Sequence, residues 1–166
     1  LKVALGADHR FPGGVIGTVD LLYTQGIDQY DLVDLNLQPP SVATGGEGNR
    51  PIYGTVDALG VATPSRRSGE FGPVIQVRNA RGNQAVLITA QLQKRFTNGT
   101  EIGGSYTYGR SRDRLSPGTD NTDGDVDFTP LDGTLESRNI TTSLWEVPHR
   151  VTLLATANLP LDFRVS

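Results

Sequence analysis

The stretch NQAVLITAQLQKRFTNGTEIGGSYTYGRSRD, residues 83–113, decides the fold class. Its first part alternates apolar and polar residues with a period of two, which predicts a β-strand with one apolar and one polar side. Thr97-Asn98-Gly99 is a strong tight-turn signal, and the alternation resumes at Thr100. The apolar side carries Val86, Ile88, Ala90, Leu92, Phe96, Ile102, Tyr106 and Tyr108, with Lys94 as the exception. The stretch therefore predicts a β-hairpin of two long strands.

The same alternation recurs along the chain. It predicts about six strands, at residues 1–8, 14–36, 74–96, 100–113, 147–159 and 161–166, the last one truncated. The connections alternate between short ones, at 9–14 and 97–99, and long ones, at 37–73 and 114–146. Short turns at one end and long loops at the other are typical of bacterial outer-membrane barrels.

Strand length supports the same class. Soluble strands average about 5–6 residues, whereas membrane strands need about 9–11, and several segments here alternate for ten residues or more. Aromatic residues form two tiers, Phe11, Phe96 and Phe163 beside the short turns and Tyr23, Tyr106 and Tyr108 further along, as aromatic girdles would. We therefore expect an all-β fold, an antiparallel up-and-down meander that forms part of a larger transmembrane β-barrel. The alternative is a soluble β-sandwich or adhesin-type binding module of a secreted protein, whose strands would also alternate.

Composition excludes several other classes. Hydrophobic residues make up 36% of the 166 residues, and no apolar run is long enough for a transmembrane helix. Cysteine is absent, which excludes disulfides and thiolate metal sites. The formal net charge of −3 gives no basic excess, so we expect no nucleic acid partner. Leu1-Lys2-Val3-Ala4 is typical of the middle of a strand and contains no signal peptide, so we expect the chain to begin inside a longer protein.

Four segments resemble one family. Residues 91–99, QLQKRFTNG, and 104–113, GSYTYGRSRD, resemble a hairpin of TonB-dependent outer-membrane receptors, most closely the Oar-like group, whose members carry a carboxypeptidase-regulatory-like domain. Residues 147–151, VPHRV, resemble the strand start that follows a long loop in those barrels, although Glu146 stands where the family often has Asp. Residues 10–14, RFPGG, with Leu22-Tyr23-Thr24, resemble another hairpin of the group. The order and spacing of the four segments match.

The resemblance implies a function for the whole protein. It implies a barrel of about 22 strands in the bacterial outer membrane, which takes up a scarce ligand with energy supplied through TonB. Siderophores, cobalamin, glycans and peptides are the family's substrate classes. The implied partners are outer-membrane lipid, the receptor's own plug domain and TonB, the last two outside this chain, together with an unknown small-molecule or peptide ligand. Specificity would lie in the two long loops.

One acidic stretch has a weak likeness to a Ca²⁺-binding loop. Oxygen ligands alternate along Asp120, Asp123, Asp125 and Asp127, with Gly124 at the bend. Leu131 stands where the bidentate Glu of an EF-hand would fall. A solvated acidic loop is the favoured interpretation, and the sequence predicts no other metal site and no cofactor.

The remaining polar residues do not suggest an enzyme. His9 and His149 are the only histidines, and the predicted topology places them at opposite ends of the barrel wall, without a nucleophile for either. A set of polar residues is expected to line the lumen, where it could contact a plug, water or ligand. The set is Asp20, Thr24, Asp28, Thr89, Gln91, Gln93, Arg95, Glu101, Arg150 and Thr156. We therefore expect no catalytic residues.

Overall fold

The computed structural model describes residues 1–166 except 41, 45–49, 119–120, 130, 159–163 and 166. The chain divides into two compact units. The first, the sheet unit, comprises Leu1–Ile27, Gly82–Asp113 and Thr142–Ser166. The second, the loop unit, comprises Asp28–Arg81 and Arg114–Thr141, and is therefore made of the two long connections.

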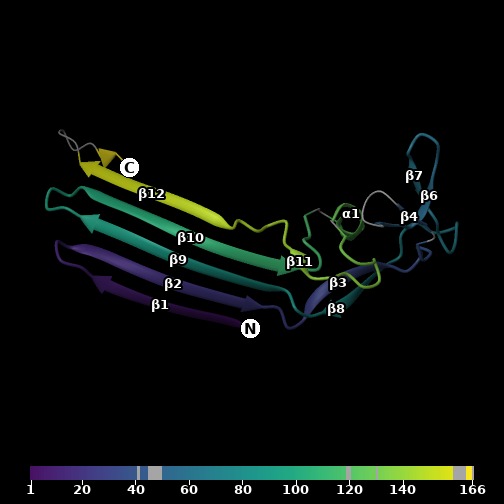
Figure 1. Ribbon diagram of the computed structural model, residues 1–166, viewed down its shortest axis with the longest axis horizontal. Coiled ribbons are helices and arrows are strands. Elements are labelled where there is room, and N and C mark those ends of the chain that lie inside the picture. The colour runs from purple at the N-terminus through teal and green to yellow at the C-terminus, as the bar shows by residue number, and fades with distance from the viewer. Residues whose placement is uncertain (41, 45–49, 119–120, 130, 159–163, 166) are drawn as a thin grey trace. The chain divides into compact units, whose positions relative to one another are not determined.

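The sheet unit is an antiparallel meander of long strands. Its order is β1-β2-β9-β10-β12-β13, and β11 pairs with β10. Figure 1 shows the β1–β2 and β9–β10 turns at one end of the sheet, so both long connections leave from the other end. The bounds are β1 Lys2–Arg10, β2 Val15–Gln25, β9 Gln84–Arg95, β10 Glu101–Asp113, β11 Thr141–Thr142, β12 His149–Asn158 and β13 Arg164–Val165. The all-β antiparallel fold expected from the alternation is confirmed.

The short turns have the predicted chemistry. In the β9–β10 turn, Phe96 N donates to Thr100 O at 2.8 Å, and Gly99 has a φ of 81°. Residues that carry a side chain rarely adopt this left-handed backbone conformation, so glycine is suited to the position. The Asn98 side chain accepts a hydrogen bond from Thr100 N at 3.1 Å. The turn fixes the register of the two longest strands, in which Ile102 faces Lys94 and Tyr108 faces Ile88.

The register divides the sheet into two faces, because paired residues project to the same side. The apolar face carries Val3, Leu5, Val15, Val19, Leu21, Tyr23, Val86, Ile88, Ala90, Leu92, Ile102, Tyr106, Tyr108, Val151, Leu153 and Ala155. The polar face carries Asp8, Thr18, Asp20, Thr24, Thr89, Gln91, Gln93, Arg95, Glu101, Ser105, Thr107, Arg150, Thr152 and Thr156, together with the apolar residues Ile16, Leu22, Leu87 and Leu154. Large side chains of the apolar face are open to the surroundings, for example Leu153 at 83% and Val151 at 68% exposure.

Two predicted strands are each divided in the structure. The segment 14–36 contains β2 and then β3, Gln29–Asp34, and the segment 74–96 contains β8, Ile75–Ala80, and then β9. β3 and β8 pair with each other in a separate two-stranded sheet. The break lies at the same level in both segments. Gly26 N still donates to Asn83 O at 2.8 Å, but Gly82, which precedes Asn83, has a φ of 102° and therefore leaves the extended conformation of a strand.

The two long connections are folded. The first contains two small hairpins, and the second contains one helix. The bounds are β4 Val42–Thr44, β5 Arg50–Ile52, β6 Gly54–Val56, β7 Ala62–Pro64 and α1 Thr122–Phe128. A small core of Leu32, Leu115 and Val126, with Ile75 and Leu135 packed against it, joins both connections. In the part of the chain that the structure describes, no helix is long and apolar enough to cross a membrane.

Candidate functional site

The polar face brings together the residues predicted to line a lumen. Asp20, Thr24, Thr89, Gln91, Gln93, Arg95, Glu101, Arg150 and Thr156 all lie on it. Asp28 does not, because the chain has already left the sheet at Ile27. It lies in the loop unit, where its carboxylate is 3.9 Å from Arg81 Nε. The alternation of sequence continues past this break, and therefore could not reveal it.

Many polar groups of this face bind one another. Thr18 Oγ1 donates to Asp8 Oδ1 at 2.5 Å, and the hydroxyls of Thr89 and Thr107 lie 2.9 Å apart. Gln93 donates to Glu101. Cross-strand pairs of this kind stabilise a sheet, so these groups hold the strands in register as well as giving the face its polarity.

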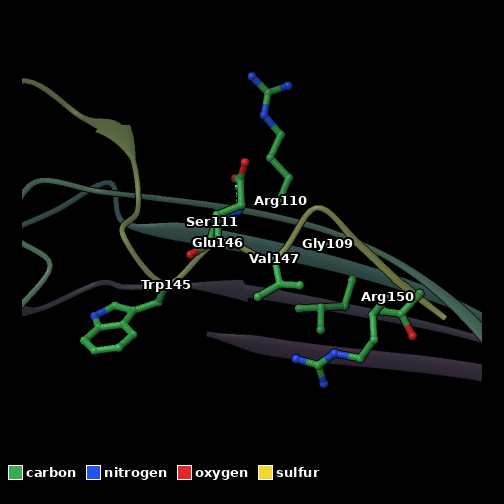
Figure 2. Close-up of a pocket in the computed structure, with 9 residues that line it drawn as sticks. Gly109, Arg110, Ser111, Trp145, Glu146, Val147 and Arg150 are labelled. Atoms are coloured by element: carbon green, nitrogen blue, oxygen red, sulfur yellow. Dashed lines mark hydrogen bonds between the residues drawn. The ribbon is translucent and has the colours of Figure 1, made fainter. Parts of the chain in front are cut away.

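A small pocket lies where the polar face meets the segment before β12 (Figure 2). Its volume is about 140 Å³, and Leu87, Thr107, Gly109 and Arg150 contribute to its lining. Figure 2 shows Trp145 and Arg150 extending on one side of the strands and Arg110 on the other. For Arg110 and Arg150 the register of β10 and β12 gives the reason, because it puts them on opposite faces. The pocket therefore offers an indole, a guanidinium, a carboxylate and a hydroxyl, from Trp145, Arg150, Glu146 and Thr107, and these groups can bind a polar ligand.

Glu146 holds the edge of this pocket. Its Oε2 accepts a hydrogen bond from Ser111 N at 2.7 Å, beyond the point where β12 stops pairing with β10. Ser143 N donates back to Ser111 O at 3.0 Å, and Gly109 N donates to Pro148 O at 3.1 Å. The segment 143–148 therefore continues the sheet without being a regular strand. In the sequence Glu146 stands out only as a departure from a motif, since nothing local identifies it as the partner of a backbone amide 35 residues away.

The two histidines lie apart, as predicted. His9 faces Gly17 on β2, and its ring meets the Phe11 ring edge-on with centroids 4.7 Å apart. His149 faces Tyr108, and its Nδ1 is 2.7 Å from the Tyr106 hydroxyl. β2, β9 and β10 separate their strands. Both belong to the apolar face, next to aromatic rings.

The acidic stretch forms a helix where a loop was expected. Asn121 caps α1 by accepting a hydrogen bond from Gly124 N at 2.6 Å, and such caps favour helix formation. Asp125 is buried and accepts a hydrogen bond from Gly118 N at 3.0 Å. Of the predicted ligands, Asp120 lies outside the described residues, and the side chains of Asp123 and Asp127 are not described. The predicted girdle residue Phe163 also lies outside the described residues. No group of three or more metal-ligating side chains occurs among the residues that can be assessed, and the weak Ca²⁺ site stays a prediction.

Comparison with known proteins decides the family. A family model described as "Outer membrane beta barrel domain" matches residues 2–164. The chain belongs to this family. No curated protein and no solved structure matches it. The barrel domain places the protein in the bacterial outer membrane, with the apolar face toward lipid and the polar face toward the interior.

The dimensions of the apolar face agree with this assignment. On β9 it is bounded by Gln84 and Lys94, which are ten residues apart, or about 34 Å along a strand. A tilt of about 40° reduces this length to a height of about 26 Å, close to the apolar band of about 25 Å found in outer-membrane barrels. A soluble sandwich would instead cover this face with a second sheet, and the exposure of Ile88, Leu92 and Ile102 argues against that alternative.

Proposed function

We propose that this barrel domain is part of an active-transport receptor, which takes up a scarce ligand with energy supplied through TonB. The observation that carries the proposal is that both long connections fold into a unit with its own core, Leu32, Leu115 and Val126. A folded unit of this kind can capture a ligand, whereas a simple pore has no need of one. The four motif-like segments, in the order and spacing of TonB-dependent receptors, support the same function.

The proposal includes the partners and the orientation. The apolar face contacts lipid, the polar face contacts a plug domain or water, and TonB acts from the periplasmic side. The short turns at residues 11–14 and 96–100 face the periplasm, and the long connections face outward. We propose no catalytic role, because binding groups line the polar face and the histidines lie on the other one.

Energy dependence tests the function. Deletion of the full-length receptor gene is expected to slow growth when one nutrient is limiting, since uptake of that nutrient then depends on diffusion. Deletion of TonB should give the same defect, and the double deletion should be no worse, because both proteins serve one step. The measurement is the growth rate of the three strains over a panel of limiting nutrients. A receptor defect that adds to the TonB defect would contradict the proposal.

Labelling of single cysteines tests the orientation. The chain has no cysteine of its own, so Leu59→Cys in the first long connection and Asn98→Cys in the β9–β10 turn each introduce one thiol here. Leu59 is 89% exposed, and Asn98 is exposed as well. A membrane-impermeant maleimide added to intact cells is expected to label Leu59→Cys only. Both variants should react in permeabilised cells, and labelling of Asn98→Cys in intact cells would reverse the orientation.

A further inference from the structure

A second cavity lies within the loop unit. Its volume is about 310 Å³, within the range of small-molecule sites, which starts at about 300 Å³. Both long connections contribute to it. The apolar part of its lining includes Leu37, Ile52, Val126, Leu131 and Leu135. The cavity can therefore hold the apolar body of a ligand.

One charged pair lies in the wall of this cavity. Arg66 Nη1 donates to Asp34 Oδ2 at 3.2 Å. Asp34 Oδ1 also accepts hydrogen bonds from Asn36 N and Val74 N, each at 2.9 Å. The Asp34 side chain is only 6% exposed, whereas that of Arg66 is 25% exposed. The aspartate thus accepts three hydrogen bonds, is largely covered, and already has a cationic partner in Arg66.

Arg66 retains binding capacity. A guanidinium has five N–H donors, and within the described residues the Arg66 side chain forms no hydrogen bond besides the one to Asp34. The charge of Arg66 is balanced by Asp34, and what the cavity offers a ligand is the remaining N–H donors of the guanidinium. A guanidinium with free donors binds a carboxylate well, because two parallel hydrogen bonds fit its shape.

Tyr53 links the two long connections in the wall of the cavity. Its hydroxyl accepts a hydrogen bond from Leu135 N at 2.8 Å and donates to Glu136 Oε2 at 3.1 Å, which ties the first long connection to the second. Burial raises the pKa of Tyr53, whose phenol is neutral at physiological pH even without this shift. A preformed wall lowers the cost of ordering the site when a ligand binds.

We propose that this cavity binds a small organic acid with an apolar body, whose carboxylate pairs with Arg66. The inference rests on the proposed function, since it names the ligand class that the receptor captures. It excludes free metal ions and organic cations as the ligand of this cavity.

The test compares an acid with an alcohol of the same shape. Full-length protein in detergent is titrated with 3-phenylpropionate and with 3-phenylpropan-1-ol, and binding is measured by calorimetry. The acid is expected to bind about tenfold more tightly, because a hydrogen bond to a charged group adds to the shared apolar contact. Arg66→Gln should remove this preference by weakening the acid alone, since the alcohol does not use the charge.

Two further variants complete the design. Arg67→Gln makes the same change of charge at the neighbouring residue, whose Nε donates to Leu37 O at 3.1 Å and which does not line the cavity. It should leave both affinities unchanged. Leu131→Trp fills the cavity with Arg66 intact, and should weaken acid and alcohol alike.

Three results would overturn the inference. The first is equal affinity of the wild type for the acid and the alcohol. The second is an equal effect of Arg66→Gln and Arg67→Gln on the affinity for the acid. The third is loss of binding of both the acid and the alcohol in Arg66→Gln. The assay needs no energy source, so its failure is distinct from failure of the transport proposal. TonB-dependent growth without acid binding would refute only the cavity, and acid binding without TonB dependence would refute only the transport.

Discussion

Replacement of Ala90 by arginine is expected to destabilise the barrel by about 2–4 kcal/mol, the cost measured for arginine near the middle of the lipid-facing band. Ala90 lies close to the midpoint between Gln84 and Lys94 on the apolar face, and it faces Val19 and Tyr106 on the neighbouring strands. An arginine there must either enter the hydrocarbon or bend toward the headgroups. Both options cost free energy, because the backbone at residue 90 is paired with a strand on each side and cannot move toward the headgroups.

Gln91→Arg is the matched control. It adds the same side chain one residue further along β9, but on the polar face, between Thr18 and Ser105. It should change the folding free energy by less than about 1 kcal/mol, as expected for a substitution that keeps its charge in a polar environment. The measurement is denaturant unfolding of the full-length protein in phospholipid vesicles. Equal destabilisation by the two variants would show that the faces are assigned wrongly.

The sheet could be predicted because its determinants are local. A period of two separates the faces of a strand, and an Asn-Gly turn fixes the register of a hairpin. Val86, Ile88 and Leu92 therefore appeared on the correct face from sequence alone. The level at which the strands end could not be predicted. Alternation continues through Gln29–Asp34, and the break depends on β3 pairing with β8 and on the left-handed Gly82.

The loop unit could not be predicted from the sequence, because the residues whose contacts stabilise it lie far apart along the chain. Asp31 lies 47 residues from Arg78 and far from Arg138, yet all three meet. The cavity beside Arg66 has the same origin, since Leu37 and Leu131 belong to different connections. In the sequence nothing distinguishes Arg66 from a surface charge, which is the usual state of an arginine in a long polar loop. Only the tertiary structure shows that it has an acidic partner and a nonpolar neighbourhood.

Loss of the Asp31 charge is expected to destabilise the loop unit by about 3–5 kcal/mol, as when one partner of a buried ion pair is removed. Asp31 is 2% exposed. Its Oδ2 accepts hydrogen bonds from Arg78 Nε at 3.0 Å and Nη2 at 2.7 Å, and its Oδ1 lies 3.5 Å from Arg138 Nε. Asp31→Asn preserves the shape of the side chain, so the effect reports the charge.

Arg138 is the reason for so large an effect. Its side chain is 1% exposed, and none of its three guanidinium nitrogens has a hydrogen-bond partner among the described residues. Burial lowers its pKa and the charge of Asp31 opposes this, but arginine stays protonated in proteins. Without Asp31 a cation would remain buried with no anion beside it. Loss of the Asp31 charge costs less free energy at Arg78, because 37% of the Arg78 side chain is exposed and can be solvated.

Hydrogen exchange of the β3 and β8 amides in the full-length protein measures the effect, since it gives the free energy of local opening. Asp28→Asn is the control: its pair with Arg81 is long, at 3.9 Å, and both side chains are exposed, so its loss should have no measurable effect. The decisive variant adds Arg138→Met to Asp31→Asn. Removal of the unpaired cation should recover most of the lost stability, because apolar replacements of buried ions are often neutral or stabilising. If the double variant were as unstable as Asp31→Asn alone, the hydrogen bonds to Arg78 and not the buried charge of Arg138 would account for the loss.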